Sequence, residues 1–245
     1  MKPIFIPKIF QEFKNVVAGV SSRDSSYPNE YGMLPRDDAI AIDNRADFAK
    51  RLGFSPDKFV VNREIHEDRV LVIDKEWQKT EADSTITQTP GWLLGVTSGD
   101  CVGALIFDPV TAAYGIFHSG WRGCRLNIAG KVIGEFERNF GSKPSDLRIY
   151  LNPAICGQHF EIGENLEPTH EIIEAFDPKY IHQDSSGMYF LDHRAIVVDQ
   201  LKLAGIDPEH LEVDLRCTYE DQELHSDRRD HVKTGRIVAA IGLKA

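Results

Sequence analysis

The chain has 245 residues, of which 42% are hydrophobic and 27% charged, values typical of a soluble globular protein long enough to bury a sizeable core. Its 38 acidic residues outnumber its 28 basic ones, and the net charge of −10 repels a nucleic-acid backbone and an anionic membrane surface alike. We therefore expect neither partner, and a single domain over residues 1–245.

The amino-terminal segment is interrupted by Pro3 and Pro7 before a signal-peptide core can form. No other stretch approaches the roughly 20 apolar residues of a membrane span. The cysteines contain no Cys-x-x-Cys pair, so they predict neither a disulfide framework nor a zinc ribbon. These features favour a cytoplasmic protein with four reduced thiols, Cys101, Cys124, Cys156 and Cys217.

The first part of the chain predicts short strands and one helix. Residues 43–52 read as a helix, because apolar residues recur among charged ones and Gly53 stands just past the end. Loop-forming residues fill positions 21–29. Strands are predicted at 16–20, 58–62, 69–73, 82–87 and 92–97.

A hairpin is predicted in the middle of the chain. Two apolar runs, Val102–Phe107 and Ala113–Phe117, flank a tetrapeptide whose Asp and Pro are turn signals, Asp108–Thr111. If the ends of this tetrapeptide face each other, Cys101 stands directly opposite His118, with Cβ atoms roughly 5 Å apart. At that distance a thiolate and an imidazole can share one metal ion or one proton. A slip of one residue would place the two side chains on opposite faces.

The C-terminal half predicts helices and strands in mixed order. Apolar residues recur at helical spacing from Ile128 to Phe140, and Gly141 ends the run. Hairpins combined with strand–helix alternation indicate an α/β fold, a single-domain layered sandwich with a mixed β-sheet and flanking helices. Further helices are predicted at 164–176 and 196–204, and strands at 147–151, 188–191, 211–215 and 236–243.

Reactive residues stand at both ends of the hairpin, where a purely structural hairpin would carry turn residues. Asp100-Cys101 precedes the first strand, and His118 is followed by Ser-Gly-Trp-Arg-Gly. Together with later motifs, these residues closely resemble the laccase-domain family of polyphenol-oxidase-like proteins, also described as zinc-dependent purine nucleoside phosphorylases. The later motifs are Asn152–Ile155, Phe160–Gly163, Cys217–Tyr219, Ser226, Arg228–Asp230 and Thr234–Arg236, and Ser22-Arg23 and Asn44-Arg45 fit more loosely.

The resemblance implies a metal site formed by His66, Cys101 and His118, with Cys101 and His118 also acting in catalysis. Two imidazoles and one thiolate suit a borderline ion such as Zn²⁺ and leave a fourth position open, as in catalytic zinc sites. The implied function is a zinc-dependent purine nucleoside phosphorylase, with adenosine deaminase and methylthioadenosine phosphorylase as further activities. The implied partners are a small-molecule nucleoside and phosphate.

The resemblance also implies substrate contacts by Arg45 and Arg229. On composition alone, Arg45 would be a solvated helix residue. A cluster of Arg228, Arg229, Lys233 and Arg236 stands out in this acidic chain. Salt bridging on a loop is the ordinary interpretation of such a cluster, and an anion pocket for phosphate is the functional one.

The chain departs from the family pattern at two places. The family usually has Gln two residues before the first histidine and Gly after it, where this chain has Glu64 and Glu67. These carboxylates could tune the ion or change what fits beside it. The family also commonly has two adjacent cysteines where this chain has Gln158-His159.

Three alternatives stay open. The first is a metal-free hydrolase or deamidase, with Cys101 as nucleophile and His118 as its base. The second is a non-catalytic metabolite-binding module, suggested by the departures. The third is a copper-dependent polyphenol oxidase, as relatives are labelled. Copper is less expected than zinc, because laccase chemistry needs several copper ions and close histidine pairs, whereas the nine histidines contain no His-x-His.

Overall fold

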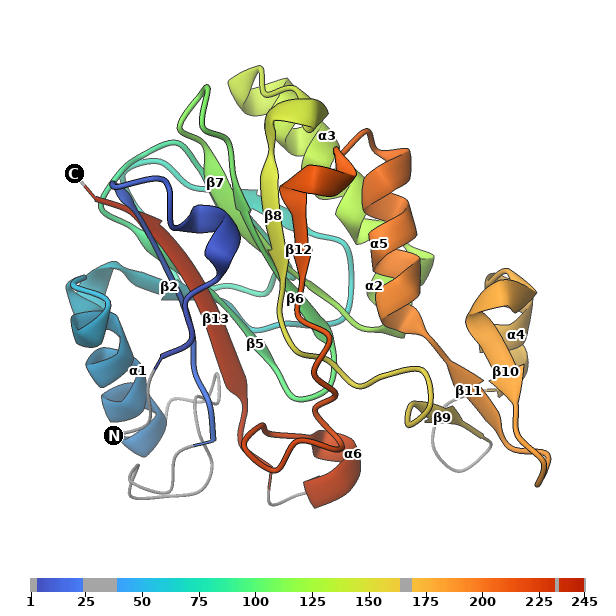
Figure 1. The fold of residues 1–245 in the computed structure, drawn as a ribbon. Helices are drawn as coiled ribbons and strands as arrows, with labels where there is room; N and C mark the ends of the chain where they lie inside the picture. The colour runs from blue at the N-terminus through green and yellow to red at the C-terminus, as the bar shows by residue number, and fades with distance from the viewer. Residues whose placement is uncertain (1–3, 24–38, 164–168, 232–233, 245) are drawn as a thin grey trace.

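The computed structural model describes residues 4–23, 39–163, 169–231 and 234–244 (Figure 1). The strands are β1 Val16–Val20, β2 Phe59–Val61, β3 Val70–Val72, β4 Ser84–Thr87, β5 Leu93–Ser98, β6 Val102–Phe107, β7 Tyr114–Ser119, β8 Arg148–Leu151, β9 Glu161–Ile162, β10 Ile181–Gln183, β11 Tyr189–Leu191, β12 Leu211–Val213 and β13 Ile237–Leu243. The α-helices are α1 Ala39–Arg51, α2 Trp121–Arg125, α3 Ile128–Phe140, α4 Thr169–Ala175, α5 His193–Leu203 and α6 Asp227–Asp230. Short 3₁₀ turns occupy Lys8–Phe10, Pro56–Lys58, Pro144–Asp146, Pro178–Tyr180 and Pro208–His210.

Two larger sheets form the centre of the molecule. The first has the strand order β1-β13-β5-β2, and the second has the order β12-β8-β6-β7-β4-β3. Each contains both parallel and antiparallel pairs, as β2 and β13 on either side of β5 illustrate. Figure 1 shows α1 on one side of this pair of sheets and α3 with α5 on the other. The molecule is therefore a layered α/β sandwich with mixed sheets.

The apolar sequence of the central strands follows from these layers. On β13, Ile237, Ala239 and Ile241 face the other sheet, whereas Val238 and Ala240 face α1. On β6, Leu105 faces the first sheet, whereas Ala104 and Ile106 belong to the cluster that contains α3 and α5. Strands buried on both faces read as continuous apolar runs. Charged groups are therefore expected where these strands end.

Most predicted elements are present, with shifted ends. The helix over Ile128–Phe140 is confirmed, and its C-cap Gly141 has a left-handed φ of 67°. The helix expected from 196 begins at His193, because the Asp192 side chain caps it by accepting from Ala195 N. The helix expected from 43 begins at Ala39. Of the helix expected at 164–176, residues 164–168 lie outside the described part of the chain.

The predicted hairpin forms with a different register. The structure pairs Gly103 with His118, not Cys101 with His118. The loop is longer than the expected tetrapeptide, because Asp108 N donates to Ala113 O and Ala112 adopts a left-handed φ of 61°. The shift is two residues, so the side chain of Cys101 stays on the face of His118, diagonal to it.

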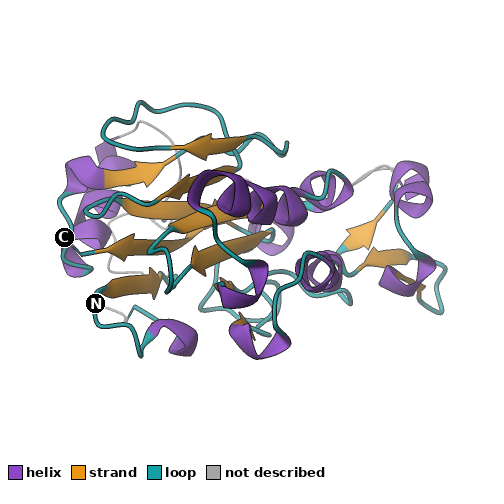
Figure 2. Cartoon of the chain, turned by 90° about the horizontal axis from the view of Figure 1, so that it is seen from above, coloured by secondary structure: helices purple, strands orange, loops and turns teal. Residues whose placement is uncertain are grey.

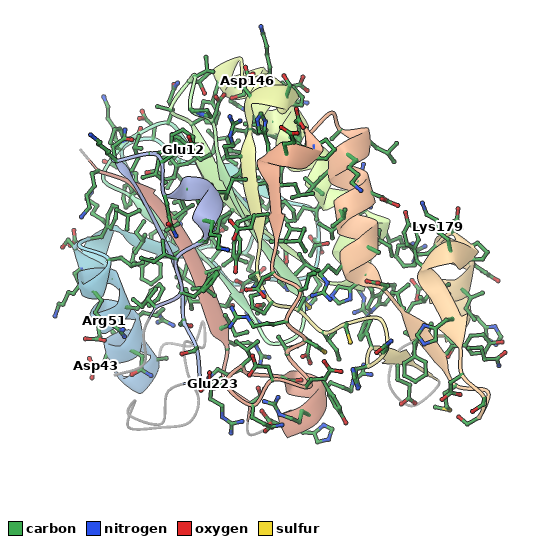
Figure 3. The ribbon with its side chains drawn as sticks, viewed as in Figure 1. Glu12, Asp43, Arg51, Asp146, Lys179 and Glu223 are labelled. Carbon is green, nitrogen blue, oxygen red and sulfur yellow. The ribbon has the colours of Figure 1, made fainter. Side chains whose placement is uncertain are left out.

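A small sheet in the order β10-β11-β9, together with α4, stands beside the stacked sheets (Figure 2). Lys179, labelled in Figure 3, is part of this unit and forms an ion pair of 2.8 Å with Asp199 of α5. Sequence analysis missed β9, β10, α2 and α6, each only two to five residues long. No helix in the described ranges combines the length and apolar character needed to cross a bilayer.

Phe136→Ala is expected to lower the free energy of unfolding by about 3–5 kcal/mol, because the ring is fully buried between α3 and β7. Urea denaturation measures the change. Leu203→Ala is the control, since Leu203 is 88% exposed and should shift stability by less than about 0.5 kcal/mol.

Candidate functional site

A cavity of about 700 Å³ opens at the end of the sandwich where β5 and β7 end and β6 begins. Its lining comes from the β5–β6 turn, the start of α2, the turn that follows β2, and the segment containing α6. These segments are far apart in sequence. Since β6 and β13 are apolar along their length, the polar lining comes from the segments at the strand ends.

The structure brings His66, Cys101 and His118 together at this cavity. One sulfur and two ring nitrogens, one from each residue, all lie within 4.8 Å of one another. The two imidazole rings are perpendicular, with centroids 4.9 Å apart. His118 is buried and His66 is exposed, so the group is reached from one side.

A buried carboxylate, Asp83, fixes two of these three side chains. Its oxygens accept hydrogen bonds from the main-chain N–H groups of Ile65, His66 and Glu67 at 2.9–3.2 Å. One of them also lies 3.0 Å from His118 Nδ1. A proton on Nδ1 leaves Nε2 of His118 as the ligand nitrogen, the arrangement in which a second carboxylate orients a metal-binding histidine. Sequence analysis missed Asp83, because an Asp before a short strand carries no distinctive signal.

Asp100 fixes the remaining side chain, Cys101, through the backbone. Its φ of 146° is unusual for a residue other than glycine. The carboxylate accepts from Thr218 Oγ1 at 2.6 Å and from Arg228 N at 2.7 Å, and its carbonyl accepts from Ile155 N at 2.9 Å. These three bonds hold the strained turn that orients Cys101.

Gly120 allows the three side chains to approach one another. A Cβ at this position would lie 3.1 Å from Cys101 Sγ and 3.2 Å from His66 Cδ2, closer than ordinary contact. The glycine of the His-Ser-Gly-Trp motif therefore serves close approach to the sulfur and the ring, since its own φ of −82° suits any residue.

The thiol and the imidazole change each other's ionisation. Burial alone would raise the pKa of Cys101, but the charge of His118 and hydrogen bonds from both imidazoles lower the pKa to about 6. Burial alone would lower the pKa of His118, but the Cys101 thiolate and the Asp83 carboxylate raise it to about 10. Without a metal, the pair is therefore a thiolate and an imidazolium at neutral pH.

The two glutamates that depart from the family pattern differ in position. Glu64 lines the cavity and accepts from Thr97 N and Thr97 Oγ1, both at 2.9 Å. Burial raises the pKa of Glu64. Glu67 is exposed and does not line the cavity, and its main-chain N–H donates to Asp83.

Both cationic side chains and an apolar wall line the cavity. The wall is made of Trp121, Ile155 and Phe160. Arg228 lies over Phe160, with its Cζ 5.2 Å from the ring centroid, and donates to Glu161 O. The basic side chains that line the cavity are Arg63, Lys79, Arg122, Arg228 and Arg236.

The two arginines expected to contact substrate lie elsewhere. The Arg229 side chain donates to the carbonyl oxygens of Thr218 and Leu224, pairs with Asp230 and does not line the main cavity, so a substrate contact by Arg229 stays a prediction. Its neighbour Arg228 lines the cavity instead. Arg45 lines a separate cavity of about 200 Å³ that shares Lys79 with the main one. A substrate contact by Arg45 stays a prediction.

His193 is a cavity residue that sequence analysis did not single out. It is 1% exposed, and among the described residues its Nδ1 has no hydrogen-bond partner. Burial lowers the pKa of His193 to about 4, so the ring is neutral at physiological pH. A neutral imidazole with an unpaired nitrogen can form one hydrogen bond to a bound ligand.

The chain is similar to known proteins over most of its length. The profile of a family described as multi-copper polyphenol oxidoreductase laccase matches residues 13–244. The chain is 34% identical to a purine nucleoside phosphorylase of Corynebacterium glutamicum over 235 residues, covering 94% of this chain and 93% of that protein. It is 28% identical to an adenosine deaminase from an unknown prokaryotic organism, covering 84% and 83%.

Solved structures have the same fold. The hypothetical protein YfiH of Bacillus licheniformis superimposes with a TM-score of 0.87 at 25% identity, covering 98% of this chain and 96% of that one. YlmD of Geobacillus stearothermophilus gives a TM-score of 0.85 at 25% identity, covering 96% and 94%.

The low pKa of Cys101 predicts its reactivity in metal-free protein. Because the thiolate is the nucleophile, alkylation by iodoacetamide should rise with pH through a midpoint near 6 and level off above it. Peptide mapping across a pH series measures the rate. Cys124, buried and with a pKa raised to about 12, is the internal control and should not react. A midpoint at the ordinary thiol pKa of about 8.5 would contradict the thiolate–imidazolium pair.

Asp83→Asn is expected to weaken metal binding by about 10–100-fold, because the amide cannot accept from all its present donors and no longer fixes the tautomer of His118. Competition with a zinc chelator measures the affinity. Asp108→Asn is the matched control: Asp108 is also a fully buried carboxylate, but it bonds only within the β6–β7 loop. An equal loss of affinity in both variants would show a general effect of destabilisation.

Proposed function

The chain belongs to the multi-copper polyphenol oxidoreductase laccase family, and from that premise we propose that it is a zinc-dependent purine nucleoside phosphorylase. The relative from Corynebacterium glutamicum named purine nucleoside phosphorylase matches 94% of this chain, which supports an enzyme acting on nucleosides. The observation that carries the proposal is the convergence of His66, Cys101 and His118 beside a cavity with both cations and an apolar wall.

His66, Cys101 and His118 would hold the zinc ion. Two imidazoles and one thiolate are ligands that zinc prefers, and Asp83 already orients His118 as such a ligand requires. Several copper ions would need more imidazoles than the two in this group. When bound, zinc supplies a Lewis acid that polarises an oxygen of a substrate or of water.

The rest of the cavity would bind and orient the two substrates. Its volume of about 700 Å³ lies within the usual range for a small-molecule site. The flat purine suits the wall of Trp121, Ile155 and Phe160, and phosphate suits the guanidinium groups of Arg228 and Arg236. The cations that line the cavity would attract an anionic ligand even though the chain carries a net charge of −10.

The proposed reaction is displacement at the ribose C1′. A phosphate oxygen forms a bond to C1′ while the glycosidic bond between C1′ and the purine breaks. The electron pair of the glycosidic bond goes to the purine, which also takes up a proton. Glu64 is our candidate for the proton donor, because burial raises its pKa and it lines the cavity. Deamination of adenosine and phosphorolysis of methylthioadenosine are further activities that we propose for the same site.

One observation favours a second candidate function. The thiolate–imidazolium pair of Cys101 and His118 is also the arrangement of a metal-free cysteine hydrolase or deamidase. We rank it second, because a nucleophile–base pair leaves His66 without a role.

We also propose that the chain is one domain acting in the cytoplasm. The absence of a Cys-x-x-Cys pair and the four free cysteines support this proposal, because thiols stay reduced in the cytoplasm. The proposed partners are a nucleoside and phosphate, without nucleic acid or membrane.

Incubating the zinc-loaded protein with adenosine, inosine or methylthioadenosine plus phosphate tests the proposal. We expect the purine base to be released and phosphate to be consumed. Chromatography measures the released base. Cys101→Ala and His118→Ala should each lower the rate at least about 100-fold. The loss is larger than that from removing a residue that only orients a metal ligand, such as Asp83. His182→Gln is the control, because His182 lies on β10, stacked on Phe190 and outside the cavity.

Two outcomes would contradict the phosphorylase. One is that no base and no deaminated product forms from any of the three nucleosides with zinc present. The other is an activity that persists after metal removal and is abolished by iodoacetamide, which would favour the cysteine hydrolase.

A further inference from the structure

A second group of thiol and imidazole side chains lies outside the cavity. Cys156, His159 and Cys217 offer ligand atoms that all lie within 4.8 Å of one another. Cys217 is 4% exposed, and the other two are half-buried. None of the three lines the main cavity, so this group is separate from the site described above.

The spacing of the ligand atoms suits a tetrahedral ion. Sulfur and nitrogen ligands of one tetrahedral zinc lie about 3.5 Å apart, given the usual zinc–ligand bond lengths. His159 Nδ1 lies 3.1 Å from Cys156 Sγ and 3.8 Å from Cys217 Sγ, on either side of that value. Small side-chain adjustments would therefore place a common centre between the three atoms.

Main-chain hydrogen bonds hold both loops in place. Ala154 and Cys217 form a parallel bridge, which joins the two segments next to the cluster. His159 N and Phe160 N both donate to Cys156 O at 3.0 Å, which closes a tight turn between the first two ligands. Asp221 N donates to Cys217 O at 2.9 Å and closes the second turn. A site built in this way is preorganised by the backbone.

The ring of His159 is oriented toward the two sulfurs. It stacks on Tyr219, with centroids 4.7 Å apart and planes 19° from parallel. Its Nδ1 is also 3.6 Å from Glu220 Oε1. Glu220 does not belong to the group whose ligand atoms all lie within 4.8 Å of one another, but its side chain is 59% exposed, so a rotation of that side chain can supply one more oxygen ligand.

We propose that Cys156, His159 and Cys217, with Glu220 as fourth ligand, form a second zinc site in this chain. The ligands are arranged as Cys-x-x-His and Cys-x-x-Glu, two short turns with the spacing of structural zinc sites. On binding, each thiol releases its proton to solvent. Four protein ligands leave no open position, so this ion has a structural role.

The position of the site explains what the ion would stabilise. Ile155, next to Cys156, donates its N–H to Asp100 O, and Thr218, next to Cys217, donates its hydroxyl to the Asp100 carboxylate. A zinc ion that joins the two loops would therefore hold both donors to Asp100, the strained residue before Cys101.

Native mass spectrometry of the full chain purified with zinc present tests the proposal. We expect two zinc ions on the unaltered chain and one on Cys101→Ala. The double variant Cys156→Ser/Cys217→Ser should also keep one. The triple variant, which combines all three substitutions, should bind none. Cys124→Ser is the matched control and should keep two ions, because Cys124 is a buried thiol outside both groups.

Two further measurements test the proposal even if the double variant does not fold. Glu220→Gln changes only an exposed side chain and should release one zinc about tenfold faster to a competing chelator. The Cys101→Ala chain loaded with Co²⁺ should still show a thiolate-to-cobalt charge-transfer band, which the triple variant should lack.

A single zinc that disappears with Cys101→Ala would overturn the proposal, as would a disulfide between Cys156 and Cys217, seen as a mass lower by two hydrogens. These counts are made without an activity assay. A single zinc that is lost with Cys101→Ala would leave the proposed phosphorylase standing without the second site. An inactive chain with two zinc ions would leave the second site standing without the phosphorylase.

Discussion

The carboxylate of Asp83 is the constraint on which the site depends. Burying a charged carboxylate costs several kcal/mol unless hydrogen bonds replace its lost water. Here three main-chain N–H groups and one imidazole take the place of the lost water. Their hydrogen bonds outweigh the effect of burial and lower the pKa of Asp83. The same four bonds hold the turn of His66 and the ring of His118 in a fixed relation. A loop residue and a strand residue thereby become one rigid pair.

The sandwich explains why this pair lies at a sheet end. The faces of β5, β6 and β13 are buried on both sides, so a charged group on them would have no water and no partner. Where β5 passes into β6, the chain leaves the layers and its polar groups can meet those of other loops. Asp100 lies at this exit, and its bonds to residues near 155, 218 and 228 join three distant segments to the turn.

Sequence patterns predicted the apolar layers well and the polar contacts poorly, for physical reasons. The hairpin register was wrong by two residues, since Ala112 takes a left-handed φ that nothing in its residue type announces. The error left Cys101 and His118 on one face, because side chains on a strand repeat every two residues. Arg228 and Arg229 illustrate the limit. Adjacent residues on a short helix point in different directions, and only the surrounding carbonyl oxygens decide which one is held in the loop.

The second cluster was hidden for a related reason. A search for Cys-x-x-Cys assumes that each turn carries two thiols, whereas here each turn carries one, followed by His159 or Glu220. The pairing depends on the bridge between Ala154 and Cys217, which sequence spacing cannot predict across some 60 residues. Yet the bridge also places Thr218 against Asp100, so one contact serves both clusters. The strained turn at Asp100 is held by donors from two loops, at Ile155 and Thr218. A zinc ion that links these two loops next to their bridge would therefore stabilise the turn most.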